Sequence, residues 1–111
     1  LSESESSYGR GIKVNATSTP GDAIHTAVSG TSDIDEVYLY AVNAHTAAVT
    51  LTIEWGGTTD PDDLIEFTIP HSSGLYVIAP GLPLQNGLDI AAFASTADVI
   101  SIFGFVNRIT A

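Results

Sequence analysis

The chain has 111 residues, no cysteine and a formal net charge of −10. We therefore expect one domain that is held together without disulfides or a thiolate zinc site. There is no Lys or Arg between Val14 and Asn107, so the chain lacks the clustered cations that a nucleic-acid partner requires.

The composition is poor in charge for so small a domain. Charged residues make up 14% of the chain and hydrophobic residues 44%, whereas typical domains carry about 25% charged residues. A small domain exposes a large share of its surface, so we expect part of that surface to be hidden against partners. No stretch approaches the roughly 18 consecutive apolar residues of a membrane span, and no membrane partner is expected.

The chain begins with the polar stretch LSESESSYGR, which lacks the basic flank and apolar core of a signal peptide. We interpret residues 1–10 as a flexible N-terminal arm, which could order against a neighbour in an assembly. Residues 11–111 are predicted to form a single β-sandwich domain.

From residue 11 onward, strand signals recur at short intervals while helix periodicity stays weak. The expected strands are 11–17, 23–28, 36–43, 47–55, 64–70, 75–80, 88–95 and 99–109. The segment GLPLQNG, residues 81–87, is predicted to be a loop or a broken edge strand because of its glycines and proline. About eight short strands predict an all-β, antiparallel β-sandwich or small barrel, and a jelly roll fits the count.

Two of these segments alternate as half-buried strands do. In the fourth, one face carries Val49, Leu51, Ile53 and Trp55, and the other carries Thr50, Thr52 and Glu54. In the fifth, Ile65, Phe67 and Ile69 share one face.

Two other segments are apolar on both faces. In 36–43, Tyr38, Tyr40 and Val42 oppose Val37, Leu39 and Ala41; in 99–109, Val99, Phe103 and Phe105 oppose Ile100 and Ile102. A strand that is apolar on both faces is usually covered on both. In a two-layer sandwich another subunit is the simplest cover, and tyrosines lying flat on the surface are the alternative.

The stretch EWGGTTDPDD, residues 54–63, holds four carboxylates: Glu54, Asp60, Asp62 and Asp63. Closely spaced aspartates can bind calcium, which makes Asp60, Asp62 and Asp63 weak metal candidates, but their spacing does not match the calcium loop of EF-hands. The two glycines and Pro61 instead predict a turn between strands. We expect a solvated loop without a bound metal.

Neither catalytic residues nor a cofactor is expected. The chain has no G-x-S-x-G, P-loop or H-E-x-x-H motif. His25, His45 and His71 lack ligand spacing, although they could meet in space or across a symmetry axis.

The aromatic residues Trp55, Tyr38, Tyr40 and Tyr76 could form a platform for sugars, but packing in a core or interface is the preferred interpretation.

Between Ile24 and Ile109 the chain resembles a known group of proteins. The stretches that carry the resemblance are DEVYLYAVNAHTAAVTLTIEWGGTTDPDDLIEFTIP, GLYVIAPGLPLQNG and FGFVNRI, with WGG, PGLPL and G-[FY]-V-N-R-I as recurring words. They are similar to small β-sandwich virion proteins of tailed bacteriophages. The resemblance implies a non-enzymatic structural protein, such as a capsid decoration (cement) protein, a head-fibre or spike base, or a neck component.

A decoration protein would be made in the host cytoplasm and would act on the capsid exterior. Its partners would be further copies of itself, with a homotrimer as the expected state, and the major capsid protein or other virion proteins. The expected contact residues are the arm with Tyr8, together with Tyr38, Tyr40, Phe105 and Arg108. Arg108 could equally form an internal salt bridge. A carbohydrate-binding module is the alternative of another class, and it predicts an exposed aromatic row flanked by polar groups.

Overall fold

A computed structural model describes residues 9–111, so most of the predicted arm, including Tyr8, lies outside the described residues. Eight strands follow one another along this part of the chain, and it contains no helix that is long and apolar enough to cross a membrane. The strands are β1 (Ile12–Val14), β2 (Asp22–Thr26), β3 (Ile34–Asn43), β4 (Val49–Trp55), β5 (Leu64–Ile69), β6 (Tyr76–Leu84), β7 (Asp89–Ala94) and β8 (Ile100–Ile109).

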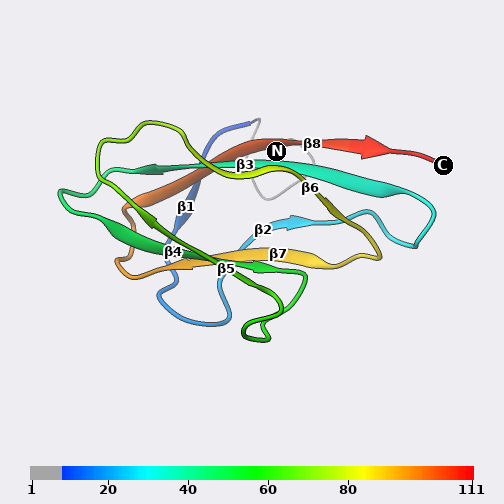
Figure 1. Cartoon of the computed structure of the whole chain (residues 1–111), viewed down its shortest axis with the longest axis horizontal. Helices are drawn as coiled ribbons and strands as arrows, with labels where there is room; N and C mark the ends of the chain where they lie inside the picture. Colours follow the sequence, from blue (N-terminus) through cyan, green and yellow to red (C-terminus); the bar gives the residue numbers. More distant parts are fainter. Residues whose placement is uncertain (1–8) are drawn as a thin grey trace.

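The strands form two antiparallel sheets of four, in the orders β1-β8-β3-β6 and β2-β7-β4-β5. Figure 1 shows them as two stacked layers, with β3 and β8 in one and β4 and β7 in the other. Pairing is nested, because β1 pairs with β8, β2 with β7, β3 with β6 and β4 with β5. This is the strand pairing of a jelly roll, so the predicted fold class is confirmed.

The core lies between the sheets and follows the period-two pattern of the strands. Along β3 every second residue is buried, which places Val37, Leu39 and Ala41 inside. The inner faces predicted for the fourth and fifth segments are also confirmed, since β4 and β5 pair Val49 with Ile69 and Ile53 with Ile65. Burial of these aliphatic side chains supplies most of the driving force for folding, at about 25 cal/mol per Å² of apolar surface.

Residues 81–84 of the ambiguous segment belong to β6, which is a broken edge strand. Its register against β3 shifts twice, between Val37 and Tyr38 and between Leu39 and Tyr40. Pro80 and Pro83 both lie in this strand, where the missing backbone N–H is tolerated because one side of an edge strand has no partner.

Gly104 of β8 has a φ of +157°, a conformation that residues with side chains rarely adopt, and it leaves no room for a Cβ beside β3. A Cβ atom added to this glycine would lie 1.9 Å from the backbone oxygen of Tyr38. That oxygen belongs to the backbone of the neighbouring strand, so it cannot rotate away as a flexible side chain would. Glycine at this position therefore permits the central pairing of the β1-β8-β3-β6 sheet.

We predict that Gly104→Ala lowers the free energy of unfolding by about 3 kcal/mol or more, because the two strands must separate to admit the methyl group. Urea denaturation followed by circular dichroism measures this change. Ser101→Ala, at a half-buried position of the same strand, is the control and should cost less than about 1 kcal/mol. Equal stability of the two variants would show that a Cβ atom at position 104 can be accommodated beside β3.

Candidate functional site

An uncharged aromatic strip occupies the outer face of the β1-β8-β3-β6 sheet. It consists of Tyr38 and Tyr40 from β3, Phe103 and Phe105 from β8, and Val77 from β6. The register pairs Tyr38 with Phe105, and Tyr40 with both Phe103 and Val77. Residues directly opposite one another in an antiparallel pair lie on the same face, so the five side chains adjoin.

The strip leaves much apolar area in contact with solvent. Phe105 and Val77 are each 51% exposed, while Tyr38, Tyr40 and Phe103 are half-buried. In the described part of the chain, the charged residues Glu36 and Lys13 lie beside the strip, because Glu36 is paired with Asn107 and Lys13 with Ser101. Three predicted contact residues, Tyr38, Tyr40 and Phe105, therefore lie together on one surface.

The ring of Tyr38 is held between its two neighbouring strands. On the β8 side it stacks on Phe105, with a centroid distance of 4.4 Å and an interplanar angle of 10°. On the β6 side it lies against Gly81, where an added Cβ would come within 3.1 Å of the ring. Both faces of this ring are used inside the protein, so it cannot offer a flat face to a sugar.

The hydroxyl group of Tyr38 is also engaged. It donates a hydrogen bond of 2.7 Å to the Glu36 carboxylate, and this bond raises the pKa of Tyr38. The phenol is thus fixed at both its ring and its oxygen. A ring that is already immobile loses little conformational entropy when a partner covers it.

The other candidates for an aromatic platform do not join this strip. Tyr76 packs edge-to-face on Phe67, with centroids 6.2 Å apart. Trp55 packs against the core and donates from its indole nitrogen to the Pro83 carbonyl, at 3.4 Å. The four aromatic residues considered for sugar binding are therefore divided between an outer face and the packed interior.

Arg108, the remaining predicted contact residue, forms an internal ion pair with Asp35. Its Nε donates to Asp35 Oδ1 at 2.7 Å and its Nη2 donates to Oδ2 at 3.0 Å. The Arg108 side chain is 35% exposed, whereas Asp35 is fully buried. The internal salt bridge, which the sequence left open, is therefore present.

Asp35 also connects the two sheets. His25 of β2 lies 2.8 Å from Asp35 Oδ2 through its Nε2, and the backbone amide of Val28 donates to the same oxygen at 3.1 Å. The hydrogen bonds from Arg108 hold the pKa of Asp35 at about 2, below its ordinary 3.8, and outweigh the opposing effect of burial. Bonds from His25 and Val28 lower this pKa further. The sequence analysis did not predict this cluster, although Asp35 lies on the face of β3 that carries the buried residues.

The segment with the metal candidates is a turn, as predicted. The Asp63 amide donates to the Thr59 carbonyl at 2.8 Å, and the Thr59 amide donates to the Asp63 carboxylate at 3.1 Å. Within residues 9–111, no three His, Asp or Glu side chains gather as a metal site. Asp60 and Asp62 are exposed, and Asp63 is engaged in its own turn.

Glu54 differs from the other acids of this segment, and the expectation that it is solvated is wrong. It points outward from β4 but is only 2% exposed. Its carboxylate accepts hydrogen bonds from the Thr19 hydroxyl at 2.6 Å and from the Gly21 amide at 2.7 Å. The segment between β1 and β2 therefore covers it, a contact between residues over 30 positions apart that the strand pattern does not reveal.

The three histidines do not form one site. His25 lies in β2, while His45 follows the end of β3 and His71 follows the end of β5. His45 is half-buried, and its backbone amide donates to the Asn43 side chain at 2.9 Å. His71 is exposed.

Comparison with known proteins adds no relative to this description. No protein-family model matches the chain, and no curated protein or solved structure matches it.

The ion cluster predicts a specific acid sensitivity. Because the pKa of Asp35 is lower in the folded chain, its contribution to stability is complete above about pH 5 and is lost as the pH falls through 3.8 to about 2. Asp35→Asn should lower the free energy of unfolding by about 2–3 kcal/mol near neutral pH, since it removes the charge from the buried end of the hydrogen bonds to Arg108. The gap between wild type and variant should shrink by about 2 kcal/mol between pH 5 and pH 2.

Urea denaturation at a series of pH values measures this gap. Asp62→Asn, at an exposed loop position, is the matched control, and its gap to wild type should stay within about 0.5 kcal/mol. A gap for Asp35→Asn that does not change with pH would contradict the low pKa.

Proposed function

We propose that the chain is a non-enzymatic structural virion protein of a tailed bacteriophage, and specifically a capsid decoration (cement) protein on the head exterior. The observation that carries the proposal is the uncharged aromatic strip on the outer face of the β1-β8-β3-β6 sheet. Contiguous apolar surface of this kind favours association, because covering it removes apolar area from water. The resemblance to small β-sandwich virion proteins supplies the biological setting.

The preferred occupant of the strip is a second copy of the same chain. Copies that each carry a formal net charge of −10 repel one another over most of their surface. The strip carries no formal charge, so it is where two copies can approach at least electrostatic cost. A homotrimer in which three strips meet around a three-fold axis would suit three-fold positions of a capsid, where many modest contacts with the major capsid protein add up.

Carbohydrate binding is the second candidate, because the strip is an exposed row of aromatic residues. The geometry of Tyr38 disfavours it: one ring face is stacked on Phe105 and the other lies against Gly81. Sugar platforms need a free ring face, whereas protein interfaces use rings in any orientation. A head-fibre base or neck component remains within the proposed class and differs only in its position on the particle.

We predict that the protein is a trimer of its 11.5 kDa chain in solution and that EDTA leaves the trimer intact. Size exclusion with light scattering, at several concentrations, measures the mass. Phe105→Ser should weaken association at least 30-fold, which corresponds to about 2 kcal/mol for a central aromatic contact. Leu75→Ser is the matched control, since Leu75 is 61% exposed outside the strip, and it should leave the mass unchanged.

A monomer at all concentrations would count against self-association through the strip. Dissociation by EDTA would instead indicate a metal held between copies.

We further predict that the protein co-sediments with heads of a tailed phage that encodes it, in a saturable ratio. Phe105→Ser should bind these heads more weakly, because a monomer loses the avidity of three linked contacts. Absence of wild-type protein from the pelleted heads would contradict the decoration role. Saturable binding of a polysaccharide in its place would favour the carbohydrate-binding alternative.

A further inference from the structure

The turn between β6 and β7 carries the one asparagine of the chain that is followed by glycine. Residues 85–88 form this turn, and the Leu88 amide lies 3.4 Å from the Gln85 carbonyl. Asn86 and Gly87 at its centre have φ angles of 63° and 67°, the left-handed conformation that an Asn-Gly pair adopts in type I′ turns. Both residues are exposed to solvent.

An Asn-Gly pair can convert its own asparagine to an acid. The backbone nitrogen of Gly87 loses its proton to solvent and attacks the side-chain carbon Cγ of Asn86; the Cγ–Nδ2 bond then breaks, and the departing nitrogen takes up a proton and leaves as ammonia. Water opens the resulting five-membered succinimide at either carbonyl, which gives aspartate or isoaspartate without oxidation or reduction. Glycine puts no side chain in the way of this attack, and a Cβ built on Gly87 would meet no atom within 4 Å.

In the folded chain the attacking nitrogen is engaged. The Gly87 amide donates a hydrogen bond of 2.9 Å to the Val28 carbonyl. The nitrogen must give up its proton before it can attack, and this bond holds that proton. The reaction therefore requires the turn to lift away from the segment between β2 and β3.

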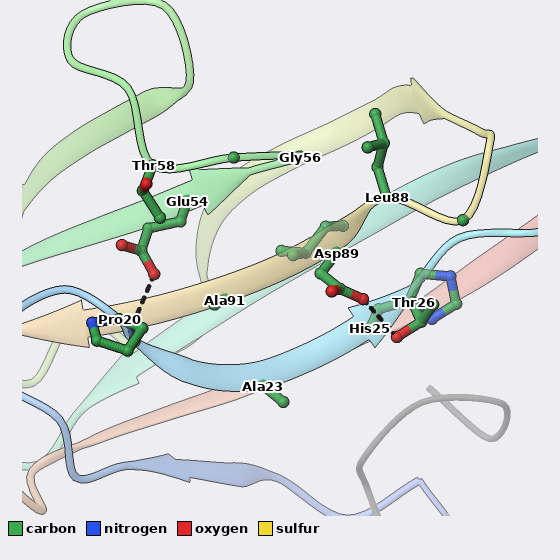
Figure 2. Close-up of a pocket in the computed structure, with 14 residues that line it drawn as sticks. Pro20, Ala23, His25, Thr26, Glu54, Gly56, Thr58, Leu88, Asp89 and Ala91 are labelled. Atoms are coloured by element: carbon green, nitrogen blue, oxygen red, sulfur yellow. Dashed lines mark hydrogen bonds between the residues drawn. The ribbon is translucent and has the colours of Figure 1, made fainter.

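A short series of surface hydrogen bonds docks the turn on this segment and on the end of β2. Besides the Gly87 bond, the pairs are Asn86 N with Gly30 O at 2.9 Å, Ala27 N with Leu88 O at 2.9 Å, Gln85 Nε2 with Asp33 O at 2.9 Å, and Thr26 Oγ1 with Asp89 Oδ1 at 2.7 Å. Figure 2 shows the last of these, where the turn enters β7. Leu88 is 43% exposed beside it. Exposed contacts of this kind open more readily than a packed core.

Val28 connects these contacts to the buried ion cluster. Its amide donates to Asp35 Oδ2 at 3.1 Å, and its carbonyl accepts the bond from Gly87. The acceptor that protects the Gly87 nitrogen is thus held in place by the carboxylate that joins the two sheets. Loosening of the cluster should therefore free this nitrogen.

We propose that Asn86 is a site of spontaneous deamidation, gated by the docking of its turn on the segment between β2 and β3. Each conversion adds a negative charge to a chain whose formal net charge is −10. The extent of conversion records how often this end of the sandwich opens. None of these residues belongs to the aromatic strip, so the proposal does not depend on self-association or on the decoration role.

The test incubates the purified full chain at mildly alkaline pH, folded in buffer and unfolded in concentrated guanidinium chloride. Mass spectrometry of proteolytic peptides then distinguishes the amide from the acid at each asparagine. In the unfolded chain Asn86 should convert faster than Asn15, Asn43 and Asn107, which precede Ala, Ala and Arg. In the folded chain Asn86 should convert at least about tenfold more slowly than in the unfolded chain, because only the opened turn reacts.

Two variants test the gate. Gln85→Ala removes the side-chain bond to Asp33 and keeps the Asn-Gly pair, so folded-state conversion should be about fivefold faster, the factor for one lost hydrogen bond. Asp35→Asn should also accelerate conversion, through Val28. Glu66→Gln, at an exposed site on β5, is the control and should match wild type.

In guanidinium chloride every variant should convert Asn86 at the wild-type rate, which separates an effect on the gate from an effect on the chemistry. The amide spectrum of each variant shows whether it is folded, and Gln85→Ala alone decides the test if Asp35→Asn is not.

Three results would overturn the proposal. Conversion of Asn86 no faster than that of the other asparagines in the unfolded chain would show that it is not the preferred site. Equal rates in the folded and unfolded chains would show that the turn does not protect it. A folded Gln85→Ala variant that converts at the wild-type rate would show that the docking contacts are not the gate.

Discussion

The carboxylate of Asp35 is the point on which the two halves of this sandwich depend. It is fully buried, and it joins Arg108 of β8 and His25 of β2, which belong to different sheets. Packing of aliphatic side chains alone allows sheets to slide, because apolar contact has no direction. Hydrogen bonds to one carboxylate have direction, so this cluster fixes the position of β2 relative to β3.

The aromatic strip lies close to this cluster along the chain. Tyr38, whose ring is central to the strip, lies three residues from Asp35 on β3. Its ring is stacked on Phe105 and its hydroxyl group is bonded to Glu36, so this part of the surface is ordered before a partner arrives.

The sequence predicted most of the architecture, because the period-two pattern of β4 and β5 is strong and local. It also named Tyr38, Tyr40 and Phe105 as contact residues, but that they share a surface follows from the pairing of β3 with β8, which the sequence did not predict. It could not predict the covered state of Glu54, which depends on Thr19 and Gly21 reaching over β4 from a distant part of the chain. The sequence did carry a local indication of the Asp35 cluster. Asp35 lies on the same face of β3 as the buried Val37 and Leu39, and a buried acid needs a hydrogen-bonding partner.

The edges of the β1-β8-β3-β6 sheet have a consequence for how copies of the chain can assemble. One edge is β1, which is only three residues long, and the other is β6, which carries two prolines and two register shifts. Neither edge presents the long row of free backbone groups that lets a sheet continue from one molecule into the next. Strand pairing between copies is therefore disfavoured at both edges of this sheet, and the sheet that carries the aromatic strip ends within one molecule.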